Sequence, residues 1–389
     1  MVRKKALIAC SNYWNSPCQV GSHHLARGFV AAGWDVAFIS HPISPLHFMG
    51  TTSRELSERL EIYRSGGQYY LDGHLWTYVP GALLAPHNKH ILRSEWVHRN
   101  WASLTYPNVI KKIYDAGFGD VDLLYFDNPN QLFLLEAIKY KTAIFRIVDN
   151  NSGYERATHA VLAMESELAR SVGLVIYTAE SLKEHVEEMQ PKAMLHVPNG
   201  VNFKHFAEGS KAQPTDLATT PRPIAIYVGA LNSWFDHTLI NWAAEQLPQV
   251  SFAIIGPDEG ARSKIAELSN IHVLGKRSYD DLPAYLHNAD VGIIPFNARE
   301  HADLVNSIHP LKLYEYMACG LPVVSAEWDE IKNINSPAYL YNSREQFLQQ
   351  LQAAVAKPQD RDSLIRYAAA ADWSARVEII LNEIEHLPK

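Results

Sequence analysis

The sequence predicts two α/β domains in tandem, each built on a parallel β-sheet. The chain has 389 residues, which is more than one compact hydrophobic core usually holds. Short apolar runs alternate with helical stretches, and strand–helix–strand units at this spacing form parallel sheets. The alternation stops at a polar segment, 207–223, and restarts after it.

Four segments divide the chain. We expect an N-terminal domain over residues 1–206, a linker over 207–223, a second domain over 224–371 and a closing helix over 372–389. The linker begins AEGSKAQPTD, which is poor in apolar residues and rich in turn formers. The closing helix is amphipathic, because its apolar residues recur every three or four positions. They are Trp373, Val377, Ile380, Leu381 and Ile384.

In the first domain, apolar runs predict strands at Lys5–Ser11, Asp35–Ser40, Leu75–Val79, Val121–Asp127, Thr142–Asp149, Gly173–Ala179 and Ala193–Pro198. We expect helices between them at 20–32, 53–64, 90–116, 130–139, 154–171 and 181–190. The loop after the first strand lacks Gly-x-Gly-x-x-Gly, so the dinucleotide fingerprint is missing.

In the second domain, the same reasoning predicts strands at Ile224–Ala230, Ser251–Ile255, Ile271–Leu274, Val291–Pro295 and Leu321–Val324. The expected helices are 236–246, 261–268, 279–288, 310–319, 343–357 and 361–371.

Composition excludes several function classes. The net charge is −7, with 47% hydrophobic and 20% charged residues, so a nucleic-acid partner is not indicated. No apolar run approaches the roughly 18–20 residues that span a bilayer, and the N-terminus does not resemble a signal peptide. The three cysteines are scattered, which favours the cytoplasm and argues against a thiolate metal site.

The stretch 307–324 carries the strongest chemical signal. Pro310 suits a helix start, and Gly320 suits the left-handed residue just past its end. Lys312 faces the positive end of the helix dipole, which is unfavourable unless an anion binds there. Glu315 lies one turn on, where a carboxylate can accept hydrogen bonds from ribose hydroxyls. An exposed Lys–Glu pair on an ordinary helix remains an equal alternative.

Asp149 is the candidate base of the first domain. It ends an apolar strand, and the carboxyl ends of strands face the ligand crevice in open α/β sheets. Asn150 and Asn151 follow it and could orient an acceptor, whereas an Asx-turn or helix cap is the structural alternative. His23 and His24 open the first helix and could face the loop before it, although solvated polar residues are commoner there. Asp120 and Asp122 form an Asp-Val-Asp, but they precede a strand and therefore do not indicate a metal site.

Several motifs together resemble the bacterial GT-B glycosyltransferases, in the neighbourhood of glycosyltransferase family 4. They occur in the family's order: VPNGVNFKHF (197–206), YVGALNSWFD (227–236), GKRSYDDLPAYL with ADVGIIPF (275–296), PLKLYEYMACGLPVV (310–324) and WSAR (373–376). Before residue 197 the likeness is only architectural.

The resemblance implies two Rossmann-like domains that face each other across a cleft, with the C-terminal helix crossing back to the first domain. The second domain would bind a nucleoside-diphosphate sugar, UDP-linked, and the first a saccharide or lipid-linked acceptor. Such enzymes need no metal and no cofactor besides the donor. Carried over by position, Lys312 and Gly229 would meet the diphosphate, Glu315 the ribose, and Arg277 and Phe296 the base.

The chain also departs from the family. Ser307 stands where many relatives carry a second glutamate, and residues 232–236 replace the usual Arg and Lys. Both departures weaken assignment to the retaining enzymes. Asp149 is similar in placement to the base of the xanthan-pathway glucuronosyltransferase, an inverting, membrane-associated relative.

The expected function is therefore hexosyl or glucuronosyl transfer in bacterial polysaccharide or glycoconjugate synthesis. A nucleotide-sugar 2-epimerase and a non-catalytic GT-B partner subunit remain as alternatives. The helix expected over 90–116 mixes aromatic with basic residues. It could meet the inner face of a membrane as a peripheral contact, or simply pack with a solvated basic face.

Overall fold

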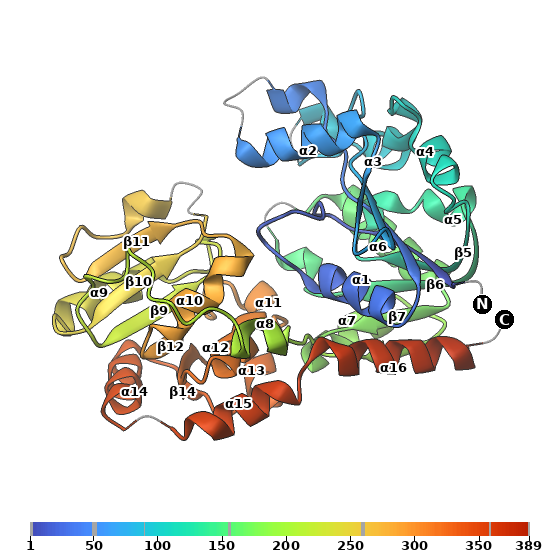
Figure 1. The fold of residues 1–389 in the computed structure, drawn as a ribbon. Coiled ribbons are helices and arrows are strands. Elements are labelled where there is room, and N and C mark those ends of the chain that lie inside the picture. Colours follow the sequence, from blue (N-terminus) through green and yellow to red (C-terminus); the bar gives the residue numbers. More distant parts are fainter. Residues whose placement is uncertain are drawn as a thin grey trace. The chain divides into compact units, whose positions relative to one another are not determined.

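The computed structural model describes residues 3–48, 53–88, 90–154, 157–257, 261–357 and 359–387. They form two compact units (Figure 1). Unit 1 runs to Pro198 and takes in the chain again from Val377, and unit 2 is Asn199–Arg376. Each unit contains one sheet of mainly parallel strands, so the predicted fold class of two parallel α/β domains is confirmed. The first boundary lies before the predicted residue 206.

Unit 1 has an eight-stranded sheet in the order β3-β4-β2-β1-β5-β6-β7-β8, in which only the edge pair β3–β4 is antiparallel. Chain order reverses between β1 and β5, which makes a topological switch point. The strands are β1 (Lys5–Ala9), β2 (Asp35–Ile39), β3 (Gln68–Tyr70), β4 (Leu75–Tyr78), β5 (Asp120–Phe126), β6 (Lys139–Ile147), β7 (Leu174–Tyr177) and β8 (Met194–His196). They read as apolar runs because helices cover both faces of a parallel sheet.

The helices of unit 1 start at capping side chains where the sequence offers them. The hydroxyls of Ser53 and Thr158 accept from backbone N–H groups three residues on. The single helix predicted over 90–116 is wrong: Pro107 cannot continue a helix, and Asn108 caps a new one. The helices are α1 (Gly21–Ala31), α2 (Arg54–Ser65), α3 (Glu95–Asn100), α4 (Val109–Asp115), α5 (Leu134–Ala137), α6 (His159–Ser171) and α7 (Lys183–Glu188).

Unit 2 has an all-parallel six-stranded sheet in the order β11-β10-β9-β12-β13-β14, with its switch point between β9 and β12. The strands are β9 (Ile224–Val228), β10 (Ser251–Ile255), β11 (Ile271–Gly275), β12 (Val291–Ile294), β13 (Val323–Ala326) and β14 (Tyr339–Tyr341). The helices are α8 (Phe203–Ala207), α9 (His237–Gln246), α10 (Leu282–His287), α11 (Ala302–Val305), α12 (Leu311–Ala318), α13 (Asp329–Ile334), α14 (Arg344–Ala356) and α15 (Arg361–Ala369).

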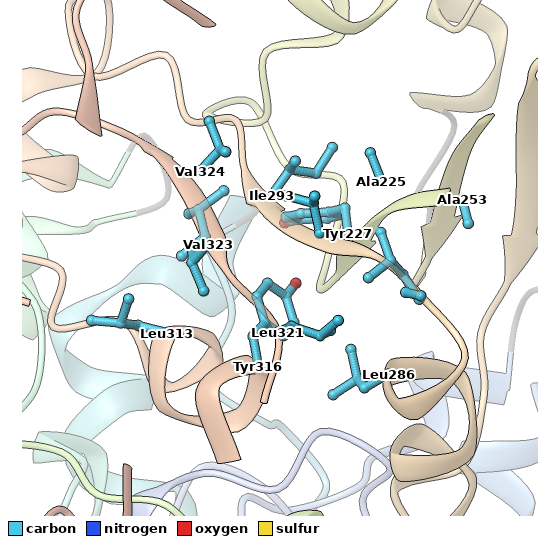
Figure 2. Close-up of a cluster of buried hydrophobic side chains, with 14 of the residues drawn as sticks. Ala225, Tyr227, Ala253, Leu286, Ile293, Leu313, Tyr316, Leu321, Val323 and Val324 are labelled. Carbon is cyan, nitrogen blue, oxygen red and sulfur yellow. The ribbon is translucent and has the colours of Figure 1, made fainter. Parts of the chain in front are cut away.

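The core of unit 2 fixes α12 against this switch point. Figure 2 shows Leu313 and Tyr316 of α12 in one cluster with the side chains of the sheet. The Tyr316 hydroxyl accepts from the backbone N–H of Val228, the last residue of β9, at 2.8 Å. A Cβ on Gly292 of β12 would lie 2.3 Å from the Tyr316 ring. The helix therefore sits directly against β9 and β12.

The last helix, α16 (Trp373–His386), starts in unit 2 and belongs to unit 1 from Val377 onward. Val377 packs on Gly28 of α1, where an added Cβ would approach the valine to 2.3 Å. The Nζ atom of Lys4 lies 3.4 Å from Oε1 of Glu385. The C-terminal end of the helix is thus part of the N-terminal unit.

The segment 207–223 is not the free linker that the sequence predicts. It belongs to unit 2, because Leu217 is fully buried in that unit's core. Asp216 pairs with Arg277 and accepts from the Tyr285 hydroxyl at 2.9 Å. Further contacts come from Arg222, which pairs with Asp290, and from the Asn288 side chain, which donates to the Lys211 carbonyl. The polar composition of the segment does not indicate this packing.

Candidate functional site

Lys312 lies at the N-terminal end of α12, where the helix meets the switch point of unit 2. Its ammonium is 4.8 Å from the ring centre of Phe296 and 5.5 Å from that of Tyr227. Gly229 follows β9 with φ +156, and an added Cβ there would lie 3.2 Å from the Lys312 Cε. Three of the predicted donor-site residues therefore meet at one place: Gly229, Phe296 and Lys312.

The start of α12 has no side-chain cap. Pro310 is the N-cap and contributes no capping hydrogen bond, so the first N–H groups of the helix are not covered by a side-chain cap. Burial lowers the pKa of Lys312 to about 8, although Glu315 opposes this shift. Burial likewise raises the pKa of Glu315 to about 7, against the charge of Lys312. A bound anion would favour the charged form of the lysine.

Arg277 and Ser307, also predicted at the donor site, have other partners. Arg277 follows β11 and pairs with Asp216, while its Nε donates to the Tyr285 hydroxyl at 2.7 Å. The buried Ser307 donates from Oγ to the carbonyl of Leu304 at 2.8 Å. Arg277 could therefore contact a nucleotide base only while it stays paired with Asp216. Ser307 stabilises the turn in which it lies.

Asp149 lies in unit 1 just past the end of β6. The Tyr154 hydroxyl donates to its Oδ2 at 2.7 Å. Burial raises the pKa of Asp149, whereas the Tyr154 hydrogen bond and the positive charge of Arg146 lower it. This half-buried carboxylate is held inside its own loop, at the sheet edge where ligands bind in such folds.

The two asparagines after Asp149 stabilise the loop rather than projecting from it. The Asn150 side chain accepts from the backbone N–H of Ser152 at 3.1 Å. Asn151 donates from Nδ2 to Oε1 of Glu165 in α6 at 2.6 Å. Both predicted acceptor-side asparagines thus make hydrogen bonds within unit 1.

His23 and His24 are buried, so their interpretation as solvated residues is wrong. His23 does face the loop before α1, where its Nδ1 accepts from the Val20 N–H at 3.2 Å and its Nε2 lies 3.0 Å from the Tyr13 carbonyl oxygen. Burial lowers the pKa of His23 to about 4, so the ring is neutral at pH 7. Both of its ring nitrogens serve the backbone, which leaves none for an acceptor.

Asp127 is a polar residue of this edge that sequence reasoning missed as a candidate. It directly follows β5 at the switch point of unit 1, where it accepts from the Ser11 N–H at 3.1 Å and from the Ser22 hydroxyl at 2.5 Å. Burial raises its pKa, and those hydrogen bonds lower it. The signal was available, since Asp127 ends an apolar strand just as Asp149 does.

Glu165 should make the stability of unit 1 depend on pH. It is 1% exposed, and burial raises its pKa to about 7. The folded state then holds a proton that the unfolded state releases near pH 4–5. The unfolding free energy should therefore fall as pH rises from about 5 to about 7, at up to about 1.4 kcal/mol per pH unit.

The measurement is denaturant unfolding at several pH values in wild type and in Glu165→Gln, which does not titrate and keeps an acceptor for Asn151. In Glu165→Gln, the unfolding free energy should no longer show this decrease between about pH 5 and pH 7. Glu184→Gln, on the exposed side of α7, should keep it. Equal slopes in wild type and Glu165→Gln would contradict the prediction.

Two family models match the chain, one on each unit. The model described as "Glucuronosyltransferase GumK, N-terminal domain" matches residues 8–178. The model described as "Glycosyl transferases group 1" matches residues 222–357. Over the described ranges, no cluster of three or more His, Cys, Asp or Glu side chains is arranged to hold a metal ion.

Similar proteins include TuaH of Bacillus subtilis (strain 168), named as a teichuronic acid biosynthesis glycosyltransferase. It is 27% identical over 150 residues, and the match spans 37% of each chain. Sucrose-phosphate synthase from Thermosynechococcus elongatus has the same fold, with TM-score 0.70, 17% identity and 98% of each chain covered. Anabaena HepE in complex with UDP and glucose also has this fold, with TM-score 0.67 and 15% identity. The match covers 99% of this chain and 100% of the HepE chain.

Proposed function

We propose that this chain, a member of the GT-B glycosyltransferases, transfers a sugar from a nucleoside-diphosphate donor to a saccharide or lipid-linked acceptor. The reaction class fits bacterial polysaccharide or glycoconjugate synthesis, and the sugar moved is a hexosyl or glucuronosyl group. A 2-epimerase is not favoured, because both matching models describe transferases.

One observation supports this proposal above all others. At the switch point of unit 2, the backbone of Gly229, which has no side chain, lies beside the ammonium group of Lys312. The glycine at 229 lets a ligand approach β9, while Lys312 and the uncapped start of α12 offer positive charge. These groups would hold the diphosphate without a metal, and Glu315 would accept from the ribose hydroxyls. The HepE complexes with UDP and with UDP-glucose support a UDP-linked donor.

The proposed chemistry is a single displacement with inversion. The acceptor hydroxyl gives its proton to Asp149 as its oxygen bonds to the anomeric carbon of the donor. The bond from that carbon to the diphosphate breaks, and the nucleoside diphosphate leaves with the electron pair. Lys312 stabilises the charge that develops on the leaving oxygen.

A lipid-linked acceptor would bring unit 1 to the cytoplasmic face of a membrane. Three large side chains of the region around α3 are exposed: Ile91 at 76%, Trp96 at 58% and Tyr106 at 82%. Aromatic and aliphatic groups of this kind suit a membrane interface, so we include peripheral membrane contact in the proposal. No helix in the part of the chain that is described has the length and apolar character needed to span a bilayer.

The test is incubation with UDP-, GDP- and dTDP-sugars, with and without a lipid-linked acceptor. Transfer to the acceptor is the expected result. Epimerised nucleotide sugar, or binding without turnover, would instead indicate an epimerase or a non-catalytic partner subunit. A thermal-shift panel first identifies the donor, because a ligand at 100 times its Kd adds about 2.7 kcal/mol to stability.

Glu315→Gln should weaken the binding of UDP but leave the binding of inorganic pyrophosphate unchanged. The amide keeps the size of the side chain while removing the charged acceptor for the ribose hydroxyls, and pyrophosphate has no ribose. A charge-assisted hydrogen bond accounts for about 1.5–3 kcal/mol. Calorimetry with both ligands checks this, and equal UDP affinity in variant and wild type would make Glu315 a structural residue.

A further inference from the structure

Three hydrogen bonds hold the loop that carries Asp149, two to neighbouring elements of unit 1 and one within the loop. At its start, the Thr178 hydroxyl donates to the Val148 carbonyl at 3.1 Å. In its middle, Asn151 donates to the buried Glu165 of α6 at 2.6 Å. At its far side, Tyr154 donates to Asp149 itself at 2.7 Å. The first contact holds the loop backbone at Val148, the second holds the side chain of Asn151, and the third holds the carboxylate.

The Tyr154 contact is selective between the two carboxylate oxygens. The phenol donates to Oδ2, and over the described ranges Asp149 accepts no second hydrogen bond from the protein. Among the described residues the carboxyl group is thus held through Oδ2 alone, which leaves Oδ1 to another donor. A substrate hydroxyl is such a donor.

We propose that Tyr154 is a positioning residue for sugar transfer, which holds Oδ2 of Asp149 so that Oδ1 takes the proton of the acceptor hydroxyl. This inference rests on the proposed function, in which Asp149 is the base. In the transfer step the proton moves from the acceptor oxygen to Oδ1, that oxygen bonds to the donor sugar, and the nucleoside diphosphate departs with its bonding electrons. Tyr154 keeps its own proton throughout.

The electrostatics of the loop give this role a distinct readout. Of the described residues, Tyr154 of the same loop and Arg146 of β6 act on the Asp149 charge, and both lower its pKa against the effect of burial. Nearby, Arg146 also acts on Asp127, which follows β5, and Glu165 of α6 contacts the loop through Asn151. Removing the phenol hydroxyl should therefore raise the pKa of Asp149, because the anion loses its hydrogen bond.

The experiment is the pH dependence of kcat/KM in Tyr154→Phe. We expect the acid limb of the profile to move up by about one to two pH units, since a hydrogen bond to a charged group shifts a pKa by that amount. Turnover below that limb should fall by about 10- to 100-fold. The KM for the donor should stay unchanged, because the proposed donor site is in unit 2.

Tyr114→Phe is the matched control, since it also removes a phenol hydrogen bond from unit 1, to the Ala137 carbonyl at 3.2 Å. Its acid limb should not move. An unmoved limb in Tyr154→Phe, with Asp149→Asn inactive, would overturn the role of Tyr154 and leave the proposed function standing. Wild-type turnover in Asp149→Asn would instead overturn the base assignment.

A second measurement does not depend on turnover. The Asp149 carboxyl can be titrated by ¹³C NMR in protein labelled at aspartate, with Asp149→Asn identifying its signal. A higher pKa in folded Tyr154→Phe than in wild type is expected. Equal values would overturn the inference.

Discussion

Replacing Asp149 with Asn should cut sugar transfer by about 10²–10⁴-fold, the usual contribution of a general base. A sugar hydroxyl is a weak nucleophile at neutral pH, and an amide accepts no proton from it. Asparagine keeps the size of the side chain and an oxygen for the Tyr154 hydroxyl, so the loop should keep its structure. Binding of UDP should remain nearly intact, because the donor groups belong to unit 2. Initial rates and calorimetry with the same preparation measure both quantities.

The pH dependence of wild-type turnover tests the same assignment, because it should change in a defined direction. Burial raises the pKa of Asp149 above the ordinary value of an aspartate. Turnover should therefore decline on the acid side at a higher pH than an exposed aspartate would give, as the base becomes protonated. Asp149→Asn should show no such limb in its residual rate.

Asp120→Asn is the matched control for Asp149→Asn. Asp120 is an exposed residue at the amino end of β5, paired with Lys139 at 2.9 Å, and the amino edge of a parallel sheet is not its ligand edge. Its turnover should equal that of wild type. If Asp149→Asn behaves in the same way, Asp149 is only a loop residue. A product with retained anomeric configuration would show that the reaction uses no such base.

The positions of most strands along the chain and the helix at the donor site could be predicted because their signals are local, whereas the short edge strands β3 and β14 were not predicted. Strands of a covered parallel sheet are continuous apolar runs, and Gly320 marks the end of α12 with φ +72. The position of Lys312 in the first turn of that helix followed from the same start and stop residues, Pro310 and Gly320. Proximity of Lys312 to Gly229 followed only from the family resemblance, because no local pattern joins the ends of α12 and β9.

What could not be predicted depends on contacts between residues far apart in the sequence. The 207–223 segment is polar in composition, yet its Leu217 is fully buried in the core of unit 2. His23 looks like a solvent-facing residue until its ring is seen to bridge the Val20 N–H and the Tyr13 carbonyl. Glu165 gave no sequence signal either, since an isolated glutamate in a helix is normally exposed.

Removing the cation at the start of α12 should be equally informative. Lys312→Ala should weaken UDP binding by about 1.5–3 kcal/mol, the range for a charge-assisted hydrogen bond, or about 10- to 150-fold in Kd. Lys332→Ala is the matched control. Lys332 is an exposed lysine of the same unit, and it pairs with Asp329 of the same helix, α13, at 3.0 Å. Its UDP affinity should not change. Unchanged affinity in Lys312→Ala would remove the anion site on which the proposed function depends.

The titration of Lys312 gives the same site a second, independent signature. Burial lowers its pKa to about 8 in the free protein, and a diphosphate bound beside the ammonium would raise that value again. UDP binding should therefore take up protons above about pH 8, and affinity should fall as pH rises through that range because the free lysine is then neutral. Calorimetry in buffers of different ionisation enthalpy measures the uptake directly. Lys312→Ala should abolish it, whereas proton uptake that persists in the variant would assign the titrating group elsewhere and leave the lysine without a role in binding the diphosphate.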